Sequence, residues 1–219
     1  MAEKMLVTQA LDERDLLVKK IGDKIVKASF TDVKKHNEEK VMEARLNEEE
    51  YKKNAESSYQ QIMDLILRFQ KIDAAIVASN AATVIHTSFG DYTVAGAISL
   101  RSRMRGLGGY DEKADFEQKL YDKMKGEMDS RLVTIESKNK QLESTAESMR
   151  LSILGKDSKT KDDKPLEVVT AYVRENTAEL VDPLDVAKKI SEIKEKRDKL
   201  LSELDTQIKV SNATTFVEI

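Results

Sequence analysis

The sequence predicts an all-α protein built from long antiparallel helical hairpins with a coiled-coil, four-helix-type core. Charged residues make up 35% of the 219 residues and aromatic residues only 5%, which is typical of long helices bathed in solvent. Apolar residues recur at helical spacing along most of the chain. Only two prolines are present, so few positions interrupt a helix.

The first two predicted elements are a helix over residues 5–28 and a connection over residues 29–47. Apolar or small side chains recur in the helix at spacings of three, four or seven residues, at Leu6, Ala10, Leu17, Ile21, Ile25 and Ala28. The stretch SFTDVKKHNEEKVMEARLN (29–47) loses this period, so we expect an irregular connection there.

The strongest periodic signal predicts a second helix packed lengthwise on another helix. Its apolar and small residues alternate spacings of four and three over about four heptads, at Tyr51, Ala55, Ser58, Ile62, Leu65, Phe69, Ile72, Ile76 and Ser79. We expect this helix to end near Ser79-Asn80, because Asn tolerates the left-handed conformation that often ends helices. The β-branched residues Thr83, Val84 and Ile85 then favour an extended segment.

A turn over HTSFGDY (86–92) leads to a third helix, for which Thr93 is the expected N-cap. This helix should break at the glycine-rich stretch RGLGGY (105–110). Residues 111–154 again show helical spacing, with a looser apolar stripe.

The C-terminal third should contain a mobile loop, an extended segment and a final helix. GKDSKTKDDKP (155–165) is polar and charged, and LEVVTAYVREN (166–176) is ambiguous, with extended structure favoured. The final helix is expected to start with Asp182 at N-cap, Pro183 at N1 and Asp185 at N3. Its inner face should be formed by Ile190, Ile193, Arg197, Leu201, Leu204, Ile208 and Ser211.

Two short motifs repeat in the same order and predict an internal duplication. The pattern D-x-x-I-x-x-S-N-A-x-T occurs twice, 132 residues apart, at Asp73, Asn80 and Thr83 and again at Asp205, Asn212 and Thr215. The pattern A-[L/I]-x-x-R places Arg14 and Arg101 87 residues apart. We expect one helical-hairpin unit over 1–85 and a second over 93–219, with an inserted helical segment at about 106–165, all in one compact domain.

Duplication leads to two expectations about contacts. The extended segments AATVI and ATTFVEI, one from each unit, are expected to pair as a short two-stranded ribbon. Asp73 and Asp205 lie close to the helical seam, and each is expected to hold the arginine of the other unit, Arg14 or Arg101.

Three stretches resemble the septicolysin-like family of bacterial and phage proteins. They are SNAATVI, then YTVAGAISLRSRM, and finally VDPLDV followed by LDTQIKVSNATTFVEI. The family pattern has an N-A-T helix end, a T-x-x-x-A-L-x-x-R helix start and a closing helix introduced by V-D. These features map onto Asn80 to Thr83, Thr93 to Arg101, and Val181-Asp182. The resemblance implies a helical architecture of unknown function and a phage or bacterial origin.

Charge and composition narrow the classes of partner and site. The net charge of −3 gives no general electrostatic reason to expect nucleic acid or an anionic membrane. No stretch approaches the roughly 18 apolar residues of a membrane span, so a cytoplasmic protein is expected. Cysteine is absent, and His36 and His86 lie in predicted loops. We therefore predict no catalytic residue, metal site or cofactor.

One stretch, SLRSRMRGLGGY (99–110), has the character of a ligand site. Its arginines precede glycines whose backbone N–H groups could approach a phosphate, and the candidate residues are Arg101, Arg103, Arg105, Gly108 and Gly109. No G-K-[S/T] follows, so this is not a Walker A motif. A charged helix end followed by a hinge is the alternative interpretation.

These observations favour a non-enzymatic structural or interaction protein that assembles as a homo-oligomer or binds a protein partner through its helical faces. The first alternative is a protein that binds a nucleotide or a phosphorylated metabolite at the arginine segment. The second is a virion or tail-associated component of a phage, and an enzyme ranks last.

Overall fold

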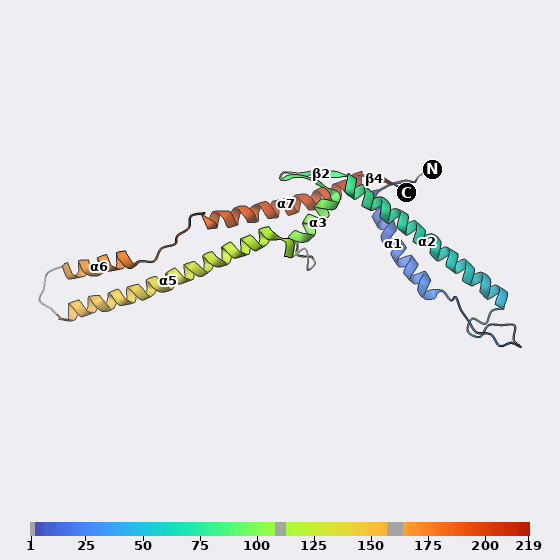
Figure 1. Cartoon of the computed structure of the whole chain (residues 1–219), viewed down its shortest axis with the longest axis horizontal. Coiled ribbons are helices and arrows are strands. Elements are labelled where there is room, and N and C mark those ends of the chain that lie inside the picture. Colours follow the sequence, from blue (N-terminus) through green and yellow to red (C-terminus); the bar gives the residue numbers. More distant parts are fainter. Residues whose placement is uncertain (1–2, 108–112, 157–163) are drawn as a thin grey trace. The chain divides into compact units, whose positions relative to one another are not determined.

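The fold is described from a computed structural model, for residues 3–107, 113–156 and 164–219. Helices dominate the described residues, which confirms the predicted all-α class (Figure 1). The elements in chain order are β1 (Lys4–Leu6), α1 (Val7–Lys27), α2 (Glu48–Ala82), β2 (Val84–Thr87), β3 (Gly90–Thr93), α3 (Val94–Met104), α5 (Phe116–Lys156), α6 (Lys164–Asn176), α7 (Val186–Thr214) and β4 (Phe216–Glu218).

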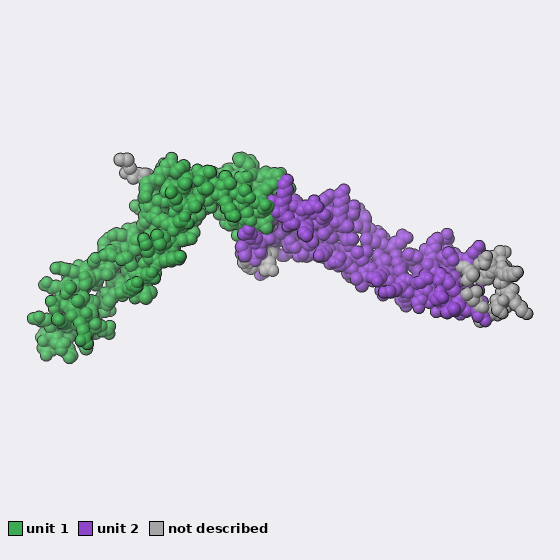
Figure 2. Space-filling model, turned by 180° about the vertical axis from the view of Figure 1, so that it is seen from behind, with its two compact units in different colours: residues 1–102, 200–219 green, residues 103–199 purple. Residues whose placement is uncertain are grey.

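The chain divides into two compact units, where the sequence predicted a single domain. The first unit comprises Met1–Ser102 and Leu200–Ile219, and the second comprises Arg103–Lys199 (Figure 2). The second unit starts close to the predicted beginning of the insertion at residue 106 and extends beyond its predicted end at residue 165.

Helices α1 and α2 form an antiparallel hairpin in the first unit (Figure 1). All nine residues of the predicted heptad seam on α2 are buried or half-buried, which confirms the seam. The hairpin core combines α1, α2 and the C-terminal strand, and consists of Val7, Ala10, Leu17, Ile72, Ile76 and Val217. Complete burial of each valine, leucine or isoleucine side chain in this core stabilises the fold by about 1.5–3 kcal/mol.

The two S-N-A-x-T helices end later than predicted and by a different geometry. Asn80 and Asn212 lie inside α2 and α7, which continue to Ala82 and Thr214. Thr83, the C-cap of α2, has an extended backbone with φ −78° and ψ 128°. Because the β-branched threonine leaves the helix directly into a strand, no left-handed residue is needed and the predicted role of the asparagines is wrong.

The predicted ribbon between the two extended segments is also wrong. β2 pairs antiparallel with β3 in a tight hairpin, whereas β4 pairs antiparallel with β1 from the start of the chain. Each strand that follows an S-N-A-x-T helix therefore pairs with the strand that leads into an A-[L/I]-x-x-R helix. Hairpin closure over a short turn makes the β2–β3 pairing local and entropically inexpensive.

The contacts of the first unit repeat at the same sequence offsets as the motifs. The amide of Val7 donates to the carbonyl of Thr215, and the amide of Val94 donates to the carbonyl of Thr83, each at 2.9 Å. The buried residues match in pairs: Val7 with Val94, Ala10 with Ala97, Ile72 with Leu204, Ile76 with Ile208, and Ile85 with Val217. The first residue of α1 and the first residue of α3 are thus each hydrogen-bonded to the threonine that directly follows the S-N-A-x-T helix of the other repeat.

In the second unit, α5 is the longest helix and packs beside α6 (Figure 1), while ion pairs from Lys196 and Arg197 of α7 reach the start of α5. The prediction of extended structure over 166–176 is wrong, because α6 is a helix that packs on α5 with Val169 buried. Paired valines favoured a strand, but burial against a helix overrides β-propensity. Of the predicted loop over 155–165, residues 157–163 lie outside the described residues.

Helix α7 starts three residues later than predicted, at Val186 rather than at Pro183. Asp185 has φ 53°, a left-handed conformation that cannot occupy the third position of a helix. Asp182 still caps the helix, because its carboxylate accepts hydrogen bonds from the amide of Val186 at 2.8 and 3.0 Å. Thr93 acts as predicted for α3, since its hydroxyl accepts a hydrogen bond from the amide of Gly96 at 3.0 Å.

Candidate functional site

Two arginine–aspartate pairs occupy equivalent positions in the first unit. Arg14 on α1 contacts Asp73 on α2 at 3.4 Å, and Arg101 on α3 contacts Asp205 on α7, also at 3.4 Å. Each aspartate therefore holds the arginine of its own repeat, so the predicted exchange of partners between repeats is wrong. Partial exposure of the four side chains limits each pair to roughly 1 kcal/mol or less.

A second arginine on the same hairpin has no equivalent in the other repeat. Arg68 on α2 contacts Glu13 on α1 at 2.8 Å and Glu3 at 2.7 Å. Hydrogen bonds from Arg68 lower the pKa of Glu13, and the two carboxylates in turn raise the pKa of Arg68. The equivalent position on α7 is the buried Leu200, so this network holds α1, α2 and the N-terminal segment only.

Among the ion pairs of the described residues, the most buried lies in the second unit, at the start of α5. Arg197 on α7 donates two hydrogen bonds to Asp115, at 2.7 and 2.6 Å, and both side chains are about nine-tenths buried. Asp115 also accepts the amide of Gln118 at 3.1 Å, so it caps α5. Burial alone would raise the pKa of Asp115, but the hydrogen bonds from Arg197 and Gln118 outweigh it and the pKa is lowered.

Sequence reasoning placed Arg197 on the inner face of its helix without finding its partner. Arg197 occupies on α7 the position that Leu65 occupies on α2, and a cation at such a seam position indicates a buried acceptor. The run Asp115-Phe-Glu-Gln118 is a capping pattern that points to Asp115 as the residue that starts α5.

The predicted ligand-binding arginines do not converge on one site. Arg101 is engaged by Asp205, whereas Arg103 and Arg105 line a cavity of about 320 Å³ in the second unit. The same cavity is lined by the ammonium group of Lys119, the carboxylates of Asp115 and Asp122 and the side-chain amide of Gln118. Met104 and Gly106 complete its lining. Gly108 and Gly109 lie outside the described residues.

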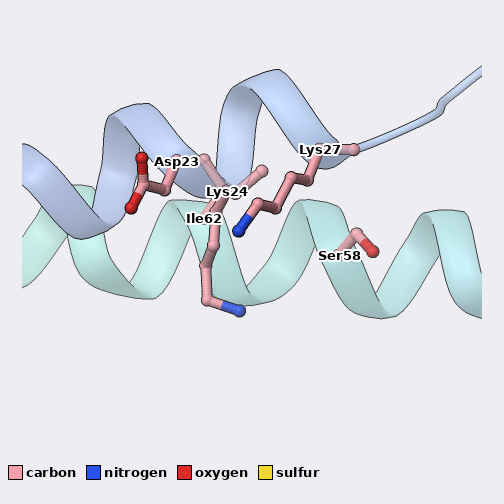
Figure 3. Close-up of a pocket in the computed structure, with 6 residues that line it drawn as sticks. Asp23, Lys24, Lys27, Ser58 and Ile62 are labelled. Carbon is pink, nitrogen blue, oxygen red and sulfur yellow. The ribbon is translucent and has the colours of Figure 1, made fainter.

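A second cavity lies between α1 and α2 and has a volume of about 300 Å³. Figure 3 shows Lys24 and Lys27 reaching from α1 toward α2, with Ser58 and Ile62 on the facing helix. The ammonium group of Lys24 donates to the side-chain amide oxygen of Gln61 at 2.8 Å. The cavity is therefore a polar groove at the far end of the hairpin rather than an enclosed pocket.

The two histidines lie in different settings. His36 is exposed in the connection between α1 and α2, as predicted. His86 lies in strand β2 rather than in a loop, and its ring Nδ1 is 2.7 Å from the carboxylate of Asp91 across the ribbon. Within the described ranges, no group of three or more His, Asp or Glu side chains is arranged to hold a metal ion.

Comparisons with known proteins and the membrane criterion complete the description. No family model, curated protein or solved structure matches the chain. Across the residues that the structure describes, no helix combines the length and apolar character needed to cross a bilayer.

Proposed function

We propose that this chain is a non-enzymatic structural or interaction protein that assembles with copies of itself through the faces of its helical hairpins. The proposal includes membership of the septicolysin-like family, a bacterial or phage origin and a cytoplasmic location. The observation that carries the proposal is the large solvent-exposed surface of the chain.

The chain exposes far more surface than a compact protein of its mass. Its accessible area is 15939 Å², whereas a compact monomer of 24.8 kDa should expose about 10,200 Å². Two separate compact domains of half this mass would together expose only about 12,300 Å². The excess over this second value therefore arises within the two units.

The reason for the excess is that each unit consists largely of paired helices. A helix in a two-helix hairpin buries one stripe and leaves its other faces in solvent. Large apolar side chains at least half exposed lie on α2, at Leu67 and Val77, and on α5, at Val133 and Leu151. Association with another copy would cover part of this surface.

Size-exclusion chromatography with light scattering tests the proposal. We expect a mass of two or more chains of 24.8 kDa at high concentration, which decreases toward that of one chain on dilution. A mass of one chain at every concentration would contradict the proposal.

A second candidate function is the binding of a phosphorylated small molecule in the cavity lined by Arg103 and Arg105. The guanidinium groups of this cavity and the ammonium group of Lys119 favour an anionic ligand, although Asp115 and Asp122 oppose it. A thermal-shift series with nucleoside mono-, di- and triphosphates should raise Tm for the parent chain and not for Arg103→Ala. Arg174→Ala on the exposed face of α6 is the matched control. No shift with any nucleotide would exclude this candidate.

A further inference from the structure

The connection between α1 and α2 is long for a segment without regular structure. It occupies residues 28–47, between the end of α1 at Lys27 and the start of α2 at Glu48. Connections longer than about 15 residues are uncommon inside compact units, and they are usually either functional or disordered. The 28–47 connection lies at the end of the α1–α2 hairpin that is opposite the strands (Figure 1).

The conformation of this connection is held by the carboxylate of Asp32. It accepts hydrogen bonds from the amides of Val33 at 2.7 Å, Glu43 at 3.1 Å and Ala44 at 2.8 Å. The amide of Ala44 contributes most to lowering the pKa of Asp32. A further backbone hydrogen bond of 2.8 Å joins the amide of Met42 to the carbonyl of Val33. The two sides of the connection are thus tied together.

Although the connection is ordered by these bonds, it leaves apolar side chains in solvent. Val33 and Met42, which are neighbours through their hydrogen bond, are 66% and 49% exposed. Only Val41 of this segment is buried. With the adjoining end of α1, the exposed apolar residues form a set that we call the hairpin tip: Ile25, Val26, Phe30, Val33 and Met42.

The charges around the hairpin tip favour a second copy of the chain as its partner. Lysines and glutamates alternate in the connection, with Lys34 paired to Glu48 and Lys35 paired to Glu38. A surface that carries both signs can be complementary to itself about a two-fold axis. Nucleic acid or an anionic membrane would instead favour a patch of one positive sign.

The area of the hairpin tip is compatible with a dimer contact. Complete burial of these five residues would remove roughly 500 Å² per copy, or about 1,000 Å² in a pair, the lower limit for a specific interface. Met and Phe are also enriched at such contacts. We infer that the hairpin tip is a self-association surface, which pairs with the hairpin tip of a second copy. This inference rests on the proposed homo-oligomeric function.

A charge-neutral double substitution tests the surface in the full chain. Val33→Lys with Met42→Glu should reduce the mass in solution to that of one chain at concentrations where the parent is a dimer or larger. The matched control is Val168→Lys with Val181→Glu, at sites that are 68% and 89% exposed in the second unit, and it should leave the mass unchanged. Far-UV circular dichroism should show the parent helix content for both.

The outcomes separate this inference from the proposed function. A parent that is an oligomer and a tip variant that keeps the same mass would overturn the inference and leave the proposed function intact. A monomeric parent would overturn both. If the monomeric parent floats with phosphatidylcholine vesicles and the tip variant does not, the hairpin tip binds membranes instead.

A cross-linking measurement keeps the inference testable if the double variant does not fold. The chain has no cysteine, so Val33→Cys introduces a single thiol. Mild oxidation should convert most of this variant into a disulfide-linked dimer, because two tips related by a two-fold axis bring the thiols together. Val168→Cys should remain unlinked. Equal cross-linking of the two variants would overturn the inference.

Discussion

Removal of the Asp115 carboxylate should destabilise the start of α5 more than the loss of an exposed ion pair would. Asp115→Ala removes the bidentate partner of the buried Arg197 guanidinium and leaves it the longer 3.8 Å contact to the half-exposed Glu117. Breaking such a pair costs about 3–5 kcal/mol. Loss of the cap on the amide of Gln118 adds about 1 kcal/mol.

The two contributions can be separated by substitution. Asp115→Asn keeps an oxygen that can cap α5 and removes the charge, so it should cost less than Asp115→Ala by about 1 kcal/mol. Replacing both members, with Asp115→Asn and Arg197→Met, should recover much of the loss, because no unpaired charge then stays buried. Glu127→Gln is the control, since Glu127 pairs with Lys123 on the exposed surface of α5 and should cost only about 0.3–0.5 kcal/mol.

Native-state hydrogen exchange is the appropriate assay because the chain has two units and global unfolding need not be two-state. The amides of the first turns of α5, after residue 118, should lose protection in Asp115→Ala by the stated free energy. Protection equal to that of Glu127→Gln would refute the reasoning, since it would mean that solvent screens the Asp115–Arg197 pair.

Three further predictions concern the repeat and the pH dependence of stability. A double-mutant cycle on Arg14 and Asp73 should give a coupling energy of about 0.5 kcal/mol, whereas a cycle on Arg14 and Asp205 should give none. Coupling of Arg14 to Asp205 instead of Asp73 would show that the arginine pairs with the aspartate of the other repeat. Ile76→Ala and Ile208→Ala, at equivalent buried positions, should each cost about 2–5 kcal/mol in urea unfolding, and a negligible cost at either site would contradict its placement in the core. The pKa values of Asp115 and Glu13 are lowered in the folded state, so these carboxylates stabilise the fold at pH values above the ordinary carboxyl range. This stabilisation should be lost as the pH falls through the folded-state pKa values. Stability that does not decrease below about pH 4 would contradict this.

Helical periodicity accounts for the elements that could be predicted from the sequence. The heptad seam of α2 and the inner face of α7 are buried or half-buried at every predicted position. A strict repeat over several turns is a long-range average, so single unfavourable residues do not obscure it. The N-cap at Thr93 is equally local, because it depends on one side chain and one amide three residues later.

The errors arose where tertiary contacts override local preference. Val168 and Val169 favour a strand, yet Val169 is buried against α5 within α6. Pairing of β4 with β1 joins the two ends of the described chain, and no local pattern specifies such a partner. The Asp115–Arg197 pair links residues far apart in sequence and was missed for the same reason.

The candidate site was predicted only in part. Arg103 and Arg105 line a cavity, but Arg101 has a structural partner in Asp205. Alternate residues on a helix point in different directions, so three arginines at a spacing of two cannot converge. The hairpin tip could not be predicted, because Asp32 orders an aperiodic segment through backbone contacts that sequence periodicity does not record.

Sedimentation equilibrium of the full chain over a wide concentration range tests most directly whether the excess surface of the helical hairpins is covered by other copies. We predict a mass of two or more chains of 24.8 kDa at high concentration, which decreases toward that of one chain on dilution. A mass of one chain throughout the range would contradict it.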